Sequence, residues 1–277
     1  MSKAGMLYIE RDTLFHRLDG AVKLIMLLAW TVIVFLFQDI RVFIVLFIIG
    51  LVLLMSAQLP WKRIRLLVWV IIVFNIFNSI FTILVSPAYG SEVNGTTTVL
   101  IDLGYEVLTL ETVFYILTLS MKYMSLMPIS ILFVYTTHPT RFAGSLNRLG
   151  VPYKIAYAFN IAFRYIPDLK KDFISISHAM QARGVGLARG EGTLIQRMKH
   201  FAAIAIPLVQ SSLARIDTVA NAMDLRGFGK NAKRTWYSSS PWGRADIGIV
   251  IVCVIVLAVS ITVRVQGFGT FWYPFNS

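Results

Sequence analysis

Long runs of apolar residues separated by short polar stretches dominate the first half of the chain, and one more run appears near its end. Each run carries at most one charged residue, and the runs cover residues 24–37 (extending back through Ala21), 40–59, 66–86, 112–135 and 247–263. A helix needs about 20 apolar residues to cross the hydrocarbon core of a bilayer. The pattern therefore predicts five membrane-spanning helices. The first is expected to be retained, because no small-residue cleavage site follows it.

Residues 137–245 follow a different pattern, in which apolar and polar positions alternate with helical spacing. One stretch places apolar side chains on a single helical face, at Ile155, Ala158, Phe159, Ala162 and Phe163. Structureless stretches longer than about 15 residues are uncommon, so we expect a large helical module and not a loop. Its amphipathic helices must cover an apolar surface, and any face left over is a docking surface for another protein.

Prolines and glycines mark the expected helix ends of this module, because proline is favoured in the first turn of a helix and glycine just past its end. The predicted helices run from Pro139 to Gly150, from Pro152 with a restart at Pro167 to Gly184, and from near Thr193 to Gly227 with a kink or break at Pro207. The chain then divides into spans one to four (1–136), the module (137–245) and the last span with the C-terminus (246–277). The predicted fold class is an all-α integral membrane protein with about five transmembrane helices plus this module.

Composition and charge orient the chain in the membrane. The sequence is 14% charged, against about 25% in average soluble domains. The N-terminal segment, the 60–65 link and the module together hold 23 of the 26 Lys and Arg, whereas the charges of loop 87–111 are all acidic. Lys and Arg are retained on the cytoplasmic side. We therefore predict a plasma-membrane protein with a cytoplasmic N-terminus and module and an external C-terminus. Topology accounts for the net charge of +12, so a nucleic-acid role loses its main support.

A short motif occurs twice in the module, as AMQARGVG at residues 179–186 and AMDLRGFG at residues 222–229. In each copy a helix is followed by an arginine and a glycine, and glycine ends a helix at low cost by adopting positive φ. Each arginine can simply cap a negative helix end. Two equivalent arginines on one side of the membrane favour the alternative, in which Arg183 and Arg226 dock into two similar grooves of a partner. The similar LARG at 187–190 lacks the AM residues, and Arg189 is interpreted as a loop residue.

Polar side chains also occur inside two predicted spans. Lys122 lies ten residues into the fourth span, where a charge is costly and often functional. A polar stripe at helical spacing on the third span is formed by Asn75, Asn78, Ser79 and Thr82. These residues either bond helix to helix within the bundle or line a seam that faces a membrane partner. The sequence leaves both readings open.

The sequence lacks the motifs of nucleotide-binding and metal-dependent enzymes. Its one Gly-Lys pair, at 229–230, is followed by asparagine and so does not complete a P-loop. The single cysteine, Cys253, cannot form an internal disulfide. The histidines are scattered and not clustered as metal ligands are, at positions His16, His138, His178 and His200. We expect no catalytic residue, no bound cofactor and no metal site.

The chain resembles the transmembrane T component of energy-coupling factor (ECF) transporters, also called the CbiQ-type protein. Its two arginine motifs are similar to the twin arginine motifs of that family. Three further segments resemble the family's H-x-L-D-P-R-x-K-L segment, its R-F-x-P signature and its basic-aromatic stretch, namely FHRLDGAVKLIMLL at 15–28, FRYIP at 163–167 and KRTWY at 233–237. Gly20 and Ala21 depart from the family's usual Pro-Arg pair, a difference that touches neither arginine motif.

The resemblance implies an energy-coupling scaffold of a bacterial importer for a vitamin or metal ion. In that family two ATP-binding cassette ATPases bind ATP, and a membrane-embedded S component captures the substrate. Arg183 and Arg226 are each expected to enter a groove on one ATPase, so that closure of the ATPases reorients the S component. The flanking residues assigned to this docking are Ala182, Gly184, Leu225 and Gly227. Candidate contacts to the S component or within a helix seam are Asn75, Asn78 and Lys122.

Other classes remain open from the residues alone. The permease subunit of an ordinary ABC importer also couples to ATPases, usually through one helix per subunit of a dimer. A membrane-embedded enzyme would be active when purified alone, and a structural scaffold would have no ATPase partner. Two similar helix ends in one chain favour the ECF-type scaffold. The transported substrate is not predicted, because the resemblance assigns its capture to the S component.

Overall fold

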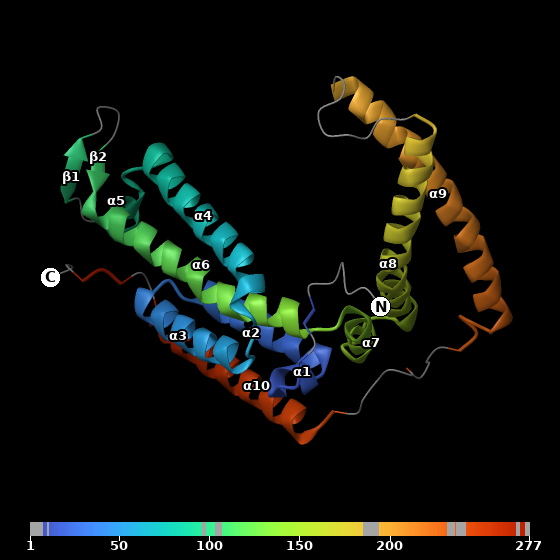
Figure 1. The fold of residues 1–277 in the computed structure, drawn as a ribbon. Coiled ribbons are helices and arrows are strands. Elements are labelled where there is room, and N and C mark those ends of the chain that lie inside the picture. Colours follow the sequence, from blue (N-terminus) through green and yellow to red (C-terminus); the bar gives the residue numbers. More distant parts are fainter. Residues whose placement is uncertain are drawn as a thin grey trace. The chain divides into compact units, whose positions relative to one another are not determined.

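The computed structural model describes residues 8–9, 11–95, 98–102, 107–184, 194–231, 236, 242–269 and 272–274. The chain forms two compact units (Figure 1). One, called here the bundle unit, comprises residues 6–138 and 240–277, and the other, called the long-helix unit, comprises residues 1–5 and 139–239.

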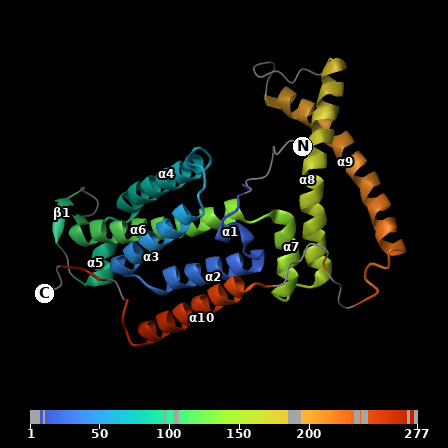
Figure 2. The same cartoon turned by 60° about the horizontal axis from the view of Figure 1, so that its bottom comes forward.

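The bundle unit is built around one central helix. Its helices are α1 (Leu14–Arg17), α2 (Gly20–Leu36), α3 (Ile40–Ser56), α4 (Trp61–Val85), α5 (Tyr89–Asn94), α6 (Leu110–Thr136) and α10 (Arg244–Val265). Helices α2, α3 and α4 all pack against α6, and α10 packs against α2 (Figures 1 and 2). A helix thus forms over each of the five predicted apolar runs.

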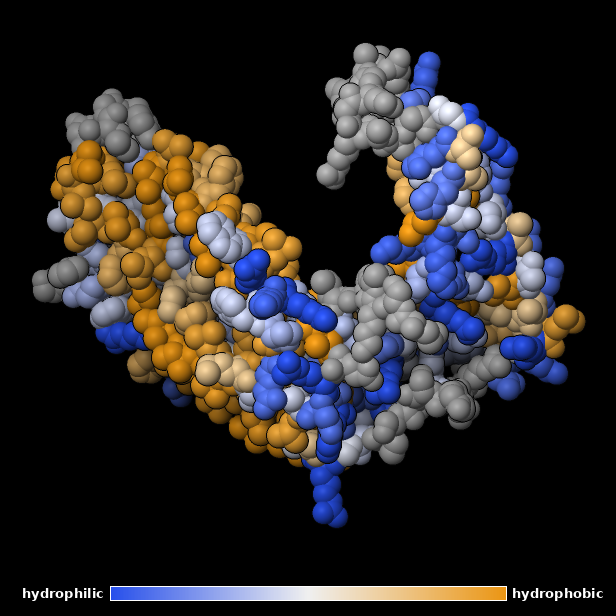
Figure 3. Space-filling model, in the orientation of Figure 1, coloured by the Kyte–Doolittle hydropathy of each residue, from blue (hydrophilic) through white to orange (hydrophobic). Residues whose placement is uncertain are grey.

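Three of these helices, α4, α6 and α10, are long and apolar enough to cross a membrane, whereas α2 and α3 are shorter apolar helices of 17 residues each. Seventeen residues span about 25 Å, slightly less than the hydrocarbon core of about 30 Å. Apolar side chains cover much of the face of the bundle that Figure 3 shows. Only 11% of the most apolar segment of α4 and 6% of that of α10 is buried, so these two helices present their apolar faces outward.

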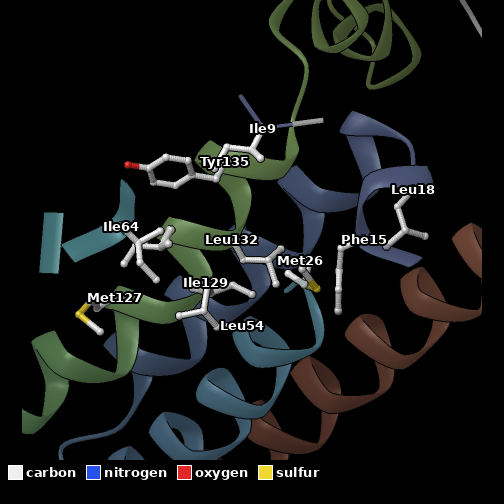
Figure 4. Close-up of a cluster of buried hydrophobic side chains, with 12 residues drawn as sticks. Ile9, Phe15, Leu18, Met26, Leu54, Ile64, Met127, Ile129, Leu132 and Tyr135 are labelled. Carbon is white, nitrogen blue, oxygen red and sulfur yellow. The ribbon is translucent and has the colours of Figure 1, made fainter. Parts of the chain in front are cut away.

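A cluster of buried side chains joins α1, α2, α3, α4 and α6 (Figure 4). Leu132 of α6 is fully buried at its centre. The other labelled members are Ile9, Phe15, Leu18, Met26, Leu54, Ile64, Met127, Ile129 and Tyr135. The cluster lies where α6 ends and α4 begins, and the Tyr135 hydroxyl donates to the Arg63 carbonyl at 2.9 Å. These contacts fix the helices to one another at that end of the bundle.

Polar groups at the same end tie the helix starts together. Asp246, which is buried, accepts hydrogen bonds from the backbone N–H of Asp19 at 3.0 Å and of Gly243 at 2.9 Å. Asp19 in turn caps α2 by accepting from the N–H of Ala21. One carboxylate therefore connects the first turn of α10 to the residue that caps α2.

Lys23 in the first turn of α2 is 2% exposed and donates to the Thr136 carbonyl at 2.7 Å. Thr136 is the last residue of α6, where the helix dipole and the unpaired carbonyls favour a cation. Burial, reinforced by the positive charge of Lys23, lowers the pKa of His16. The site therefore holds a lysine without a second cation beside it at neutral pH.

The opposite end of the bundle contains a small antiparallel strand pair, β1 (Val99–Asp102) and β2 (Val107–Thr109). The chain is mostly helical, as predicted, and this pair is a small element within the loop predicted at 87–111. The preceding helix α5 is held against α6, because the N–H of Gly90 donates to the Thr112 hydroxyl at 2.9 Å. A β-carbon at Gly90 would lie 2.3 Å from the backbone of Glu111, so only glycine allows this approach.

After α10 the chain folds back over the same end of the bundle. This C-terminal strap is described for residues 266–269 and 272–274. The N–H of Gln38 donates to the Gly269 carbonyl at 2.9 Å, and the Arg41 guanidinium lies 3.5 Å from the centre of the Trp272 ring. Phe114 of α6 meets the rings of Trp272 and Tyr273 edge-on. The strap thus joins the α2–α3 turn to the start of α6.

The long-helix unit contains α7 (Pro139–Arg148), α8 (Tyr153–Ala182) and α9 (Leu194–Leu225). The predicted restart at Pro167 is wrong, because α8 runs through it without interruption, and α9 likewise runs through Pro207. A proline removes one backbone hydrogen bond from a helix. The carbonyl that loses its partner belongs to Phe163, which is only partly buried, so water can reach it and the helix continues.

Replacing Lys23 with methionine is expected to destabilise the bundle unit. The Thr136 carbonyl loses a charged donor, and hydrogen bonds to charged groups contribute about 2 kcal/mol. We expect the thermal midpoint of the purified chain in detergent to fall by roughly 4–8 °C. The exposed Lys199→Met variant is the control and should melt like the wild type. Equal midpoints for all three proteins would show that Lys23 does not hold the end of α6.

Replacing Trp272 with alanine is expected to loosen the strap. The variant loses the cation–π contact with Arg41 and the ring contact with Phe114, together worth about 1–2 kcal/mol. Thermal melting in detergent should show a lower midpoint than the wild type. Phe268→Ala removes an exposed ring of the same strap and serves as the matched control. A Trp272→Ala midpoint no lower than that of Phe268→Ala would contradict this role.

Candidate functional site: two arginine-tipped helix ends

The end of α8 carries the first of the two repeated arginines. Arg183 is the residue that follows the last helical position, Ala182. The next residue, Gly184, has φ of +83° and its N–H donates to the Gln181 carbonyl at 2.9 Å. This is one of the two hydrogen bonds of a Schellman helix end. The residue that would form the second bond lies outside the described part of the chain.

The end of α9 has the same geometry. Gly227 has φ of +66° and donates to the Asp224 carbonyl at 2.9 Å, and Phe228 donates to the Met223 carbonyl at 3.0 Å. Together these bonds form a complete Schellman motif, with Arg226 at the capping position. The prediction that a positive-φ glycine ends each helix beside its arginine is confirmed.

The glycine cap by itself does not distinguish these two ends. Gly150 after α7 and Gly267 after α10 also have positive φ, and the backbone closes the helix in the same way at both. Neither end places an arginine at the capping position, where α7 has Leu149 and α10 has Gln266. Among these four helix ends, only those of α8 and α9 have an arginine at the capping position.

Both arginine-tipped ends are open to the surroundings. All six residues predicted to dock are exposed, and the Leu225 side chain is 91% exposed. Within the described part of the chain, neither Arg183 nor Arg226 makes a side-chain hydrogen bond or ion pair. A β-carbon at Gly184 or Gly227 would meet nothing within 4 Å, so glycine is required there by its φ and not by lack of space.

An ion pair joins the two long helices. Asp172 of α8 and Arg215 of α9 meet at 2.5 Å, and the Arg215 guanidinium also lies 5.8 Å from the centre of the Tyr165 ring. Arg183 follows Asp172 by eleven residues, and Arg226 follows Arg215 by the same number. Each arginine therefore lies about 16 Å beyond the ion pair along its own helix. This contact was not predicted, because its only signal in the sequence is opposite charge on two successive helices.

The two arginines lie toward opposite ends of the α8–α9 pair. Phe228, just past the end of α9, packs against Tyr153 and Tyr157 in the first turns of α8. Together with the Asp172–Arg215 pair, this contact makes the two helices antiparallel. Arg226 accordingly lies near the start of α8, and Arg183 at its end. Figure 2 shows the same opposed course of the two helices.

A tryptophan secures the base of α8. The Trp236 indole N–H donates to the Asn147 side chain of α7 at 3.1 Å, and its ring also contacts Tyr157. Trp236 belongs to the KRTWY segment, whose other residues lie outside the described part of the chain. The same holds for Arg189 and the LARG sequence.

Two polar residues of the predicted spans contact neighbouring helices. Asn75 is 6% exposed and donates to the Ser120 carbonyl of α6 at 3.1 Å. The Asn78 carbonyl accepts from Thr82 within α4. Lys122 is partly buried, with its ammonium 4.5 Å from the centre of the Phe35 ring of α2. The structure thus places Asn75 and Lys122 against neighbouring helices of the bundle.

The chain is similar to known transport proteins along nearly its whole length. Residues 11–237 match the family described as CbiQ, cobalt transport protein. The energy-coupling factor transporter transmembrane protein EcfT of Lactococcus lactis subsp. cremoris is 28% identical, over 91% of this chain and 94% of its own. The EcfT proteins of Streptococcus equi subsp. equi and Bacillus subtilis are 28% and 26% identical, over 91% and 93% of this chain and 93% and 96% of their own.

The family match covers most of the bundle unit and all described residues of the long-helix unit, including both arginine-tipped ends. With the apolar helices of the bundle, it identifies the chain as a membrane protein of energy-coupling transport. The chain belongs to the CbiQ family, which is the family of the transmembrane T components of ECF transporters.

Proposed function

We propose that this chain links ATP hydrolysis by two cytoplasmic ATPases to movement of a substrate-binding S component in a bacterial importer. The observation that carries the proposal is the pair of exposed arginines, each held by the same glycine cap at the end of a long helix. Two equivalent arginine side chains suit two similar grooves on the ATPases. The names of the relatives, energy-coupling factor transporter transmembrane proteins, agree with such a role.

Arginine suits these tips for a chemical reason. Its planar guanidinium donates several hydrogen bonds in a fixed geometry to carboxylates or carbonyls, which lysine cannot reproduce. With no partner inside the described part of the chain, the Arg183 and Arg226 guanidinium groups are available to an ATPase groove. The neighbouring Leu225, 91% exposed, adds an apolar contact that would be covered on docking.

The long helices also leave a face that suits the S component. Apolar side chains recur along α8 and α9 at helical spacing and remain largely exposed, including Ile155, Phe159, Ile166, Val209, Leu213 and Ile216. Exposed apolar surfaces of this extent mark contacts with other proteins or with a membrane. We assign this face to the S component. Asn75, Asn78 and Lys122 are assigned to seams within the bundle, because two of them already contact neighbouring helices.

The charge of the bundle ends supports a cytoplasmic N-terminus. The end where α2, α4 and α10 begin carries Lys23, Lys62, Arg63, Arg65 and Arg244. The opposite end carries only two basic residues in these helices, Arg41 and Arg264, together with the acidic Glu92 and Glu111. The positive-inside rule then places the first end in the cytoplasm. In this arrangement α2, α3, α4, α6 and α10 all cross the membrane, the strand pair and the strap are external, and the long-helix unit is cytoplasmic.

The chain itself is proposed to be non-catalytic. The partner ATPases bind and hydrolyse ATP, and the S component selects the vitamin or metal ion that is carried. No cofactor or metal is assigned to this chain.

Reversing the charge of both tips, Arg183→Glu with Arg226→Glu, is expected to abolish co-purification of the ATPases and to abolish uptake. Membrane insertion should be unchanged, because both arginines are exposed and their side chains make no hydrogen bond or ion pair with the rest of the described chain. Each single variant should retain part of the association. Lysine at both positions should fail to restore full uptake, because it preserves only the charge.

The matched control is Lys170→Glu with Lys199→Glu, which makes the same charge change at exposed positions of the same two helices. This control should keep both ATPases in pull-downs of the tagged chain from membranes. If the Arg183→Glu, Arg226→Glu variant recovers the two ATPases as well as the wild type does, the docking role is contradicted.

Cysteine labelling tests the orientation. In a Cys253→Ala background, a cysteine replacing Glu92 should react with a membrane-impermeant thiol reagent in intact cells. A cysteine replacing Lys199 should react only after permeabilisation, because it lies on the cytoplasmic unit. Labelling in the reverse order would invert the proposed topology.

A further inference from the structure

Helix α4 carries an open apolar groove along its outward face. The groove has a volume of about 450 Å³ and is lined by Trp69, Val70, Val73, Phe74 and Phe77. All five residues belong to α4 and recur at helical spacing, so they form one continuous stripe. The five residues are between 49% and 65% exposed, so the described part of the chain leaves the stripe largely uncovered. Figure 3 shows hydrophobic side chains along α4 and hydrophilic ones where it begins.

Basic residues stand at one end of this groove. Lys62 and Arg63, in the first turn of α4, are exposed. At 100° per residue Lys62 is aligned with Trp69 and Val73, and Arg63 with Val70. Seven residues of helix separate Lys62 from Trp69 and Arg63 from Val70, a rise of about 10 Å. The sequence of α4 contains no acidic residue, so the positive charge at the head of the groove is not neutralised from the same helix.

The composition of the groove favours a flexible chain as its occupant over another helix. Helices that pack closely in membranes use small residues at the contact, and the sequence of α4 contains neither glycine nor alanine. Its polar side chains face α6 instead, where Asn75 and Ser79 meet Ser120. The groove side presents bulky aromatic and branched residues, between which an acyl chain can lie.

We infer that an anionic phospholipid occupies this groove, with its headgroup phosphate on Lys62 and Arg63 and an acyl chain between Trp69 and Phe77. Measured along the helix from the basic pair, the groove begins at about 10 Å and ends at about 20 Å. An acyl chain whose headgroup lies on the basic pair reaches this depth within one leaflet of a core about 30 Å thick. Basic clusters at the cytoplasmic ends of membrane helices recognise anionic headgroups. The inference rests on the membrane placement proposed above and not on the docking of the two arginine tips.

Native mass spectrometry of the full chain tests the site, with dioleoylphosphatidylglycerol and dioleoylphosphatidylcholine titrated separately. The first bound phosphatidylglycerol should be favoured roughly 30-fold over phosphatidylcholine, as two basic contacts predict. Lys62→Gln with Arg63→Gln should abolish this preference. Arg65→Gln, which removes a charge from the same turn but off the line of the groove, should leave most of it.

Filling the groove separates the acyl site from general charge attraction. Val73→Trp should reduce the first binding step of both lipids, and Val70→Trp provides a second variant of the same design. Ile255→Trp, at an exposed apolar position of α10, should bind both lipids like the wild type. Near-ultraviolet circular dichroism checks that each variant is folded.

Three results would overturn the inference. One is equal binding of the two lipids by the wild type, and another is unchanged binding by both folded groove variants. The third comes from the assembled transporter in membranes, with a cysteine at Val73 in the Cys253→Ala background. Efficient cross-linking of that cysteine to a partner subunit would show that a protein helix covers the groove instead.

Discussion

The last carbonyl groups of a long helix have no partner within the helix, and the way they are satisfied decides whether its end can carry a functional side chain. In α8 and α9 a positive-φ glycine turns the backbone over those carbonyls immediately after the arginine. An end that frayed over several residues would leave the arginine on a mobile segment. With the cap, the positions of Arg183 and Arg226 follow the axes of their helices, and the proposed coupling depends on that.

The bundle unit keeps most of its polar contacts at its two ends. Lys23 and Asp246 join the helices at one end, and the strap with Arg41 joins them at the other. Because these contacts and the core around α6 hold the bundle together, the outer faces of α4 and α10 need no sibling helix. They can therefore remain apolar and exposed, which suits a surface surrounded by lipid.

The sequence predicted the features that depend on local chemistry. The apolar runs predicted five helices. The glycines after Arg183 and Arg226 predicted where α8 and α9 end, since glycine adopts positive φ at low cost. The restart at Pro167 was wrong, because the cost of a missing hydrogen bond depends on whether the neighbouring carbonyl is exposed. The Asp172–Arg215 pair and the Arg41–Trp272 contact were missed, since each joins residues far apart in sequence. Whether the tips bind ATPases stays a prediction.

The Asp172–Arg215 ion pair has a mechanical consequence. It lies eleven residues from the arginine on each helix, so the two arginines lie at equal distances from the ion pair along their own helices. If one helix turned against the other by about 10° around this pair, each tip would move by about 3 Å relative to the other helix, at an arm of about 16 Å. The contact of Phe228 with Tyr153 and Tyr157 would then have to change at the Arg226 end. Because the two distances are equal, the displacements of the two tips relative to the other helix are equal in size.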